Sequence, residues 1–425
     1  MMNKVGPALG LLTMAGLIAA CGGTTPAQRS SSPSASSGPS KTVTVNVGAV
    51  YPLTGTEALN GQDELHGVQL AVDVLNGQYP SIGLPALTGK KINLTSLDTE
   101  SNPSTAATEV QTLVASDHVV GIMGAFESGV TASASEEANR LQVPFVTDSS
   151  NLDSLTTRGY TYFFRTAADE AVEVDAYYSF LKQMSSSHPV STAVIVYRND
   201  AFGGPFASLI QSTAAAHGIN IVKTIPFSPS PTSLTTEATL AESYHPDEVF
   251  FYGLTPSTLL FMHTLASVGY TPPALLTNGG GSDDPTLAAS LGNLADYMYN
   301  VYPWFSGMTA TSHLAAQVAT EYQALFGKAM DPTSALAFQG MIALGDAINS
   351  VTGNVTPQAV RDALANLDIT KTIMPWAGIK FDSSGQNALA SAAIVQMQAG
   401  EFKAVYPASV AQASAVWPAP AFSSR

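Results

Sequence analysis

The chain of 425 residues carries 17 Lys and Arg against 32 Asp and Glu, a formal charge of −15, and 45% of its residues are hydrophobic. This length and apolar content suffice for more than one hydrophobic core, so two lobes are expected. The acidic balance leaves no basic surplus to neutralise phosphates, which argues against nucleic acid as a partner.

The first residues have the features of an export signal. Lys4 precedes an apolar run from 5 to 20 that ends in small residues before Cys21. The run is short for a bilayer and contains Gly and Pro, so cleavage is favoured over a membrane span. Cys21 is the only cysteine, so no internal disulfide can form. Its position resembles the lipobox of bacterial lipoproteins, which implies that residues 1–21 are a lipoprotein signal peptide and that Cys21 is lipidated.

A Ser- and Pro-rich stretch follows from 22 to 41. It lacks the apolar residues that would let it fold, so we expect a disordered tether between the lipid anchor and the folded part.

From 42 onward, short apolar runs of strand length alternate with helical patterns. The predicted strands of a first series are 42–51, 92–97, 119–123 and 143–147, and its predicted helices are 61–76, 104–115 and the stretch ending at Arg140. Such alternating units predict a parallel sheet with helices on both faces.

A second series of the same kind begins after 166. Its predicted strands are 193–197, 219–225, 248–252 and 274–277, and its predicted helices are 169–184, 205–216, 233–243 and 257–268. Helical patterns at 312–326, 336–351 and 357–367 follow and are expected to return to the first lobe. The fold class is therefore α/β, with two doubly wound parallel-sheet lobes.

The stretch from Val119 to Arg140 predicts a strand, a sharp turn at Gly124 and a helix that begins near Ser128. The unpaired amides at a helix start, beside a serine hydroxyl and the positive end of the dipole, can hold a small carboxylate. The alternative is an ordinary turn with Ser128 as a helix cap.

The patterns of common enzymes are missing or weak. A nucleophile elbow requires glycine two residues before the serine, where this chain has Phe126. The seven histidines have no zinc-site spacing, and the glycines at 279–281 lack the Lys-Ser/Thr of a phosphate loop. The sequence therefore predicts no catalysis, no metal and no cofactor.

Taken together, the motifs resemble the bacterial solute-binding proteins for branched-chain amino acids and amides, which have the type I periplasmic binding fold of ABC importers. The resemblance covers about 43–407. The residues that carry it are GAVYPLTG (48–55) with Gly61, GVQLA (67–71), GIMG (121–124) with Ser128, VPFVT (143–147), LT (155–156) with RGY (158–160), and FRT (164–166).

The resemblance implies two lobes joined by a three-segment hinge and closing on a ligand at the carboxyl ends of the strands. Crossings are expected near 165–167, 300–303 and 373–375. The first lobe would comprise 42–166 and 303–373, and the second 167–302 and 374–425. By resemblance, Ser128 is a hydroxyl-bearing ligand contact, and Ser149 and Asn151 occupy the positions whose backbone and side chain bind the ligand's carboxylate and amino group. The full expected ligand-binding set is Ser128, Ser149, Asn151, Tyr51, Asn60, Phe126, Glu127, Phe202, Leu254, Gly280 and Asp283.

One departure from the family bears on the ligand. Amino-acid-binding members place an acidic residue after a strand of the second lobe to meet the ligand's ammonium group, and this chain has Asn-Gly-Gly-Gly at 278–281. Leu254 and Phe202 also make the pocket more apolar. We therefore expect a solute without a free α-ammonium, unless Glu127 or Asp283 supplies the carboxylate.

The resemblance implies a lipid-anchored, extracytoplasmic solute-binding protein that captures a small carboxylate- or amide-bearing solute and delivers it to an ABC importer. The expected partners are this solute, the importer permease and the membrane through the lipid anchor, and the chain is expected to act as a monomer. The alternative is a ligand sensor of the same fold that is coupled to signalling or regulation.

Overall fold

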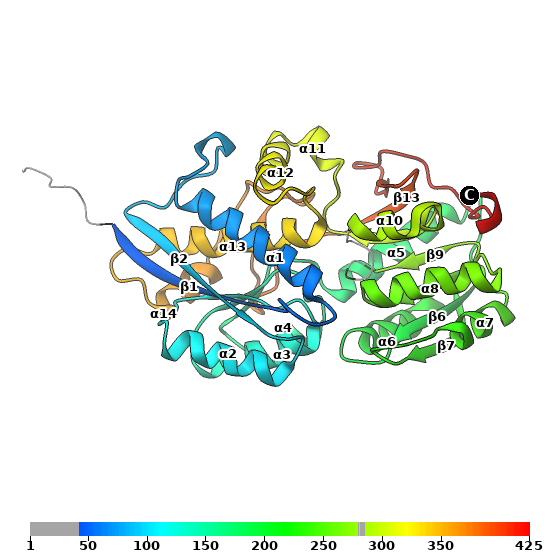
Figure 1. Cartoon of the computed structure of the whole chain (residues 1–425), viewed down its shortest axis with the longest axis horizontal. Coiled ribbons are helices and arrows are strands. Elements are labelled where there is room, and N and C mark those ends of the chain that lie inside the picture. The colour runs from blue at the N-terminus through cyan, green and yellow to red at the C-terminus, as the bar shows by residue number, and fades with distance from the viewer. Residues whose placement is uncertain (1–41, 279, 281–284) are drawn as a thin grey trace, which may run out of the picture. The chain divides into compact units, whose positions relative to one another are not determined.

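A computed structural model describes residues 42–278, 280 and 285–425, which form one compact unit containing two main sheets and a small two-stranded hairpin (Figure 1). The predicted signal peptide, Cys21 and the tether lie outside the described residues. We call each sheet with its covering helices a lobe.

The sheet of the first lobe is fully parallel, with strand order β2-β1-β3-β4-β5. Its strands are β1 (Val43–Tyr51), β2 (Lys90–Asp98), β3 (Ile122–Gly124), β4 (Phe145–Thr147) and β5 (Phe163–Arg165). Its helices are α1 (Ala58–Leu75), α2 (Pro103–Ala115), α3 (Ser128–Arg140), α4 (Ser154–Thr157), α12 (His313–Phe326), α13 (Pro332–Ser350) and α14 (Pro357–Ala365), with the short α11 (Met308–Thr311) before α12.

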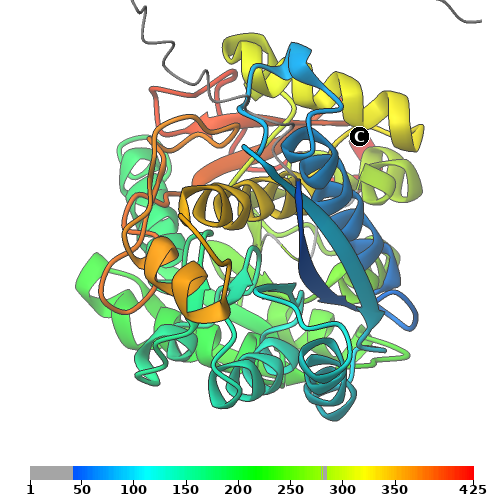
Figure 2. The same ribbon diagram turned by 90° about the vertical axis from the view of Figure 1, so that its left-hand side faces the viewer.

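Helices cover both faces of this sheet because its strands are apolar on both sides. Val47 and Ala49 belong to the core shared with α1 and α13, whereas Val50 belongs to the core shared with α2 and α3. Helices α1 and α13 lie side by side although they are far apart in the sequence (Figures 1 and 2). At their contact, a Cβ on Gly67 would lie 2.1 Å from the Ser334 carbonyl oxygen, so only glycine allows this approach.

The sheet of the second lobe has the order β14-β13-β10-β9-β8-β6-β7. Its strands are β6 (Thr192–Arg198), β7 (Asn220–Phe227), β8 (Glu248–Tyr252), β9 (Leu275–Thr277), β10 (Tyr299–Tyr302), β13 (Ala393–Gln398) and β14 (Glu401–Tyr406). The strands from β6 to β10 pair in parallel. Strand β13 pairs antiparallel with β10, and β14 pairs antiparallel with β13.

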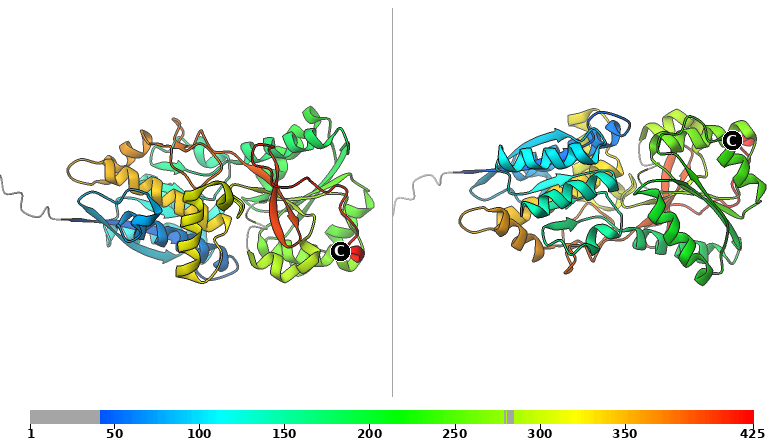
Figure 3. Two further views of the ribbon diagram at one scale, coloured as in Figure 1. Left: turned by 90° about the horizontal axis from the view of Figure 1, so that it is seen from above. Right: turned by 90° about the horizontal axis from the view of Figure 1, so that it is seen from below.

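Helices also cover both faces of the second sheet (Figure 3). Ile195 and Phe250 pack in the core of α5 (Glu170–Met184) and α6 (Gly203–Thr213). Val196 and Phe251, the next residues along each strand, pack in the core of α7 (Thr235–Ser243), α8 (Thr255–Val268) and α10 (Pro285–Leu291).

The segment before β13 lies against the first sheet. It contains the small hairpin of β11 (Asp368–Ile369) and β12 (Ile379–Lys380). The Arg165 amide donates to the Gly385 carbonyl over 2.8 Å, and the Asn387 amide donates to the Arg165 carbonyl over 2.9 Å. In the structure the last passage between the sheets therefore follows Asn387, later than the expected crossing at 373–375, because these backbone bonds tie 385–387 to the end of β5.

The expected fold class is confirmed, and the β13–β14 hairpin is an addition that the sequence patterns did not predict. Among residues 42–278, 280 and 285–425, no helix is both long and apolar enough to cross a membrane.

Candidate functional site

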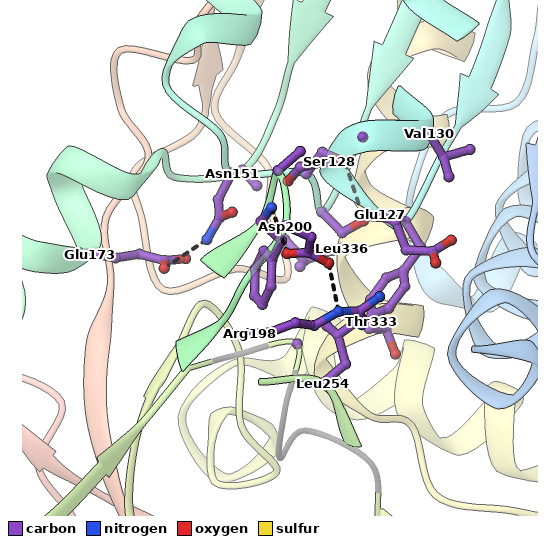
Figure 4. A pocket seen from close by; sticks show the side chains of 18 of the residues that line it. Glu127, Ser128, Val130, Asn151, Glu173, Arg198, Asp200, Leu254, Thr333 and Leu336 are labelled. Atoms are coloured by element: carbon purple, nitrogen blue, oxygen red, sulfur yellow. Dashed lines mark hydrogen bonds and ion pairs between the residues drawn. The ribbon is translucent and has the colours of Figure 1, made fainter. Parts of the chain in front are cut away.

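A cavity of about 280 Å³ lies where the loops at the carboxyl ends of the strands in the two sheets meet (Figure 4). It is lined by Ser101, Pro103, Phe126, Glu127, Ser128, Gly129, Val130, Ser149, Ser150, Asn151, Ala167, Ala168, Glu173, Arg198, Asp200, Ala201, Phe202, Leu254, Gly280, Pro303, Thr333, Leu336 and Ala392. Residues from both lobes contribute, as expected for a site at the carboxyl ends of parallel strands.

Ser128 is the first residue of α3, and its side chain is 1% exposed. Its hydroxyl has no hydrogen-bond partner among the described residues, and no side chain caps α3. The interpretation of Ser128 as a helix cap is therefore wrong. A buried hydroxyl without a partner costs free energy, and the first amides of a helix also lack intrahelical partners. Ser128, Gly129 and Val130 line the cavity together, so these donors suit an acceptor on a bound molecule.

The turn before α3 depends on Gly124. Its φ is 146°, and a Cβ at this position would lie 2.4 Å from the Val50 carbonyl oxygen. Only glycine permits this conformation and this approach. The turn directs the chain from β3 to the start of α3, where Ser128 lies.

Asn151 provides a second polar group at the cavity. Its side-chain N–H donates to the Glu173 carboxyl over 2.9 Å, and its carbonyl oxygen Oδ1 is buried with no partner among the described residues. Tyr252 also donates to Glu173, over 3.3 Å. Burial raises the pKa of Glu173 to about 8. Because the N–H group of Asn151 is taken by Glu173, its Oδ1 is the atom left to accept from a bound molecule.

Acidic groups surround one guanidinium at another part of the cavity. Arg198 Nε lies 2.6 Å from Asp200 Oδ2, and Arg198 Nη1 lies 3.5 Å from Glu57 Oε1. Burial and the nearby Glu57 together raise the pKa of Glu127 to about 7, although Arg198 opposes the shift. The Oε2 atom of Glu127 is buried without a hydrogen-bond partner among the described residues.

The remaining wall is apolar. Phe126, Phe202, Leu254 and Leu336 contribute hydrophobic side chains. A Cβ on Gly280 would lie 3.2 Å from Leu254 Cδ2 and 3.6 Å from Phe126 Cζ, so the two lobes approach closely here. A small molecule with one polar end and an apolar body fits such a lining.

The structure brings together eight of the residues expected from sequence: Phe126, Glu127, Ser128, Ser149, Asn151, Phe202, Leu254 and Gly280. The Ser149 hydroxyl is already engaged, because it donates to Glu64.

Two expected residues do not reach the cavity. Tyr51 is 1% exposed and donates to Asp148 over 2.7 Å, so its hydroxyl is bonded inside the first lobe. Asn60 is 3% exposed on α1 and bonds the Glu57 carboxyl, which it helps to keep ionised. Asp283 lies outside the described residues.

Sequence reasoning missed Glu173, Arg198, Asp200 and Thr333. Arg198 and Asp200 stand at the carboxyl end of β6, where ligands of parallel sheets commonly bind, so their place in the sequence could have pointed to them. Glu173 lies in the first turn of α5, which carried no such signal. Within the described part of the chain, no group of three His, Cys, Asp or Glu side chains could hold a metal ion.

Two α/β lobes with a partly apolar cavity between their strand ends define a class of two-lobed proteins that enclose small molecules. A sequence model described as "Periplasmic binding protein" matches residues 44–401. The chain belongs to this periplasmic binding protein family.

Similar proteins agree with this assignment. The chain is 28% identical over 378 residues to the Leu/Ile/Val-binding protein homolog 7 of Brucella suis biovar 1, covering 86% of this chain and 92% of that protein. It is 26% identical to homolog 8 of Brucella abortus over 377 residues, covering 86% and 91%.

Two solved structures show the same fold. One is the substrate-binding protein of a branched-chain amino acid transporter from Streptococcus pneumoniae in complex with isoleucine, with a TM-score of 0.74, 21% identity and coverage of 86% of this chain and 100% of that one. The other is an ABC transporter solute-binding protein from R. palustris in complex with benzoate, with a TM-score of 0.74, 20% identity and coverage of 88% and 98%.

Proposed function

We propose that this protein captures a small carboxylate- or amide-bearing solute outside the cytoplasm and delivers it to an ABC importer. The solute would bind in the cavity between the lobes, with its carboxylate or amide oxygen at the start of α3. The backbone of Ser149 and the side chain of Asn151 would contribute further polar contacts, and Phe126, Phe202, Leu254 and Gly280 would enclose the apolar part.

The observation that carries this proposal is the Ser128 hydroxyl, which is buried at the cavity without a partner among the described residues. A carboxylate that loses its water on lobe closure needs donors in return, because an unpaired buried charge is very costly. The hydroxyl and the first amides of α3 supply such donors. The relatives named for leucine, isoleucine and valine, and the structures with isoleucine and benzoate, support a solute with a carboxylate.

A thermal-shift screen of the purified protein tests the proposal. The compounds are amino acids, their amides, and aliphatic and aromatic acids, with neutral sugars as the control class. A solute that binds only the folded state raises the melting temperature. We expect a rise with at least one carboxylate or amide and none with the sugars. A rise with sugars alone would contradict the proposal.

The charge of Glu127 bears on whether the cavity favours a solute with an ammonium group. The family's acidic residue is missing at 278–281, and Glu127 was one of two carboxylates that could replace it. Glu127 does line the cavity, but its pKa of about 7 leaves it partly neutral. We propose that the preferred solute lacks the ammonium. Calorimetric titrations with leucine and with 4-methylpentanoate, its analogue without the amino group, compare the two cases. Tighter binding of leucine would contradict this preference and show that a carboxylate at the cavity, such as Glu127, meets the ammonium group.

We also propose that Cys21 is lipidated and that residues 22–41 tether the folded part to the membrane surface. The motif at Cys21 and the composition of the tether support this proposal. The protein would then act as a monomer beside its permease, without catalysing a reaction.

A further inference from the structure

Three pairs of residues are among the contacts that bring the two lobes together around the cavity. Gly280 approaches Phe126, and a Cβ on Gly129 would lie 3.5 Å from the Cβ of Ala201. The third pair is Arg198 and Glu57, whose charged groups lie 3.5 Å apart. The first two contacts involve only apolar atoms. The third is an ion pair, which adds electrostatic attraction to the hydrogen bond that Asn151 donates to Glu173 across the lobes.

Arg198 is held in its own lobe and faces the other. It is the last residue of β6, and Asp200, two residues on, fixes its Nε over 2.6 Å. Asp200 in turn accepts from the amides of Phe202 and Gly203, over 3.0 and 3.1 Å. The guanidinium is therefore positioned before any contact with the first lobe forms, which reduces the entropy lost in making that contact.

Two carboxyl groups of the first lobe face this guanidinium. Glu57 precedes α1 and is 2% exposed, and Glu127 precedes α3. Arg198 lowers the pKa of both groups, while their burial raises it. Without Arg198, two buried carboxyl groups would face each other with no cation, an arrangement that disfavours closure.

Arg198 also separates the main cavity from a second one. A neighbouring cavity of about 280 Å³ is lined by Thr56, Glu57, Pro229, Ser230, Pro231, Thr232, Pro256 and Ser257. Arg198 and Leu254 line both cavities. The side chain that joins the lobes thus lies between the two cavities.

We propose that Arg198 is a latch that stabilises the closed arrangement of the lobes by bridging to Glu57. It is a positioning residue that slows solute release by keeping the cavity shut. This inference rests on the proposed capture of a solute between the lobes. The alternative is that Arg198 serves only its own lobe through Asp200.

Pulsed electron paramagnetic resonance between spin labels tests the latch. The full chain has one native cysteine, so a Cys21→Ser background allows labels at Thr108→Cys on α2 and Ser208→Cys on α6, both exposed. The ratio of short to long inter-label distances then reports closure without solute. We expect Arg198→Ala to lower this ratio roughly threefold or more, as for a partly buried ion pair.

Three further variants separate the latch from a local role. Arg198→Lys keeps the charge and should restore part of the closed population. Glu57→Gln should open the lobes as Arg198→Ala does, and the double variant should open them no further. Arg361→Ala is the control, since Arg361 pairs with its neighbour Asp362 in α14.

An Arg198→Ala ratio equal to that of the unsubstituted protein, or additive effects of Arg198→Ala and Glu57→Gln, would overturn the latch. So would a protein with no short-distance population at all. If the distances shift as expected but no compound in the thermal-shift screen binds, the proposed function fails and the latch stands.

Discussion

The side-chain N–H of Asn151, which follows a strand of the first sheet, donates over 2.9 Å to the carboxyl of Glu173 on α5 of the second lobe. This bond joins the lobes beside the cavity and turns the Asn151 carbonyl oxygen away from Glu173. Glu173 therefore influences the site through Asn151. Its protonation state can be followed through the stability of the protein at different pH values.

The first prediction concerns pH. The folded-state pKa of Glu173, about 8, lies above its ordinary value of 4.5, so between these pH values the folded protein holds a proton that the unfolded chain has lost. The free energy of unfolding should then fall as pH rises from about 5 to 8. Glu173→Gln should reduce the slope of the free energy of unfolding against pH by up to the contribution of one bound proton. Urea unfolding at four pH values measures the slope. The exposed Glu401→Gln is the control, and an unchanged slope in Glu173→Gln would refute the prediction.

The second prediction separates a supporting residue from a ligand contact. Tyr51→Phe removes the bond to the buried Asp148 and should lower the free energy of unfolding by about 1–3 kcal/mol. Solute affinity should stay the same, because Tyr51 does not line the cavity. The exposed Tyr244→Phe should change neither quantity. Loss of binding in folded Tyr51→Phe would place Tyr51 in the site after all.

The third prediction concerns the contact between α1 and α13. Gly67→Ala would place a methyl group 2.1 Å from the Ser334 carbonyl oxygen and should cost about 1–3 kcal/mol of stability or more. Gly204→Ala in α6 meets no atom within 4 Å and should be neutral or stabilising. Denaturant unfolding compares the two. Equal stability of both variants would show that the helices can move apart without cost.

The fourth prediction tests the lipid anchor. Cys21→Ala should leave the protein uncleaved or release it from the membrane fraction, while the folded part keeps its melting temperature. Fractionation of cells with detection of the processed form measures this. A processed, lipidated Cys21→Ala variant would show that the anchor lies elsewhere.

The sequence predicted most elements of the fold because its local patterns are strong. The strand predicted at 42–51 is β1 at Val43–Tyr51, and the helix predicted at 357–367 is α14 at Pro357–Ala365. The β13–β14 hairpin was not predicted because its turn, Ala399-Gly400, has positive φ at both residues but lacks the usual Asn-Gly sequence.

The candidate site was predictable only where it depends on the ends of strands. Ser128, Ser149 and Asn151 were expected from the family resemblance, and their places after predicted strands agreed with a site at one edge of the sheet. Glu173 and Arg198 could not be linked to Asn151 and Glu57, because those contacts depend on how the lobes meet. Tyr51 ends a strand too, but its side chain points into the first lobe and bonds Asp148.

The most direct test of the proposed solute site is a calorimetric titration of the unsubstituted protein and of Ser128→Ala. The titrant is the solute that gives the largest shift of melting temperature in the screen. Ser312→Ala, which removes the side chain that caps α12, is the matched control and should lose about 1 kcal/mol of stability with no change in Kd. If the Ser128 hydroxyl holds the carboxylate or amide oxygen, Ser128→Ala should weaken binding by roughly 1.5–3 kcal/mol, about ten- to a hundredfold in Kd. A Kd equal to that of the unsubstituted protein would contradict the proposed site.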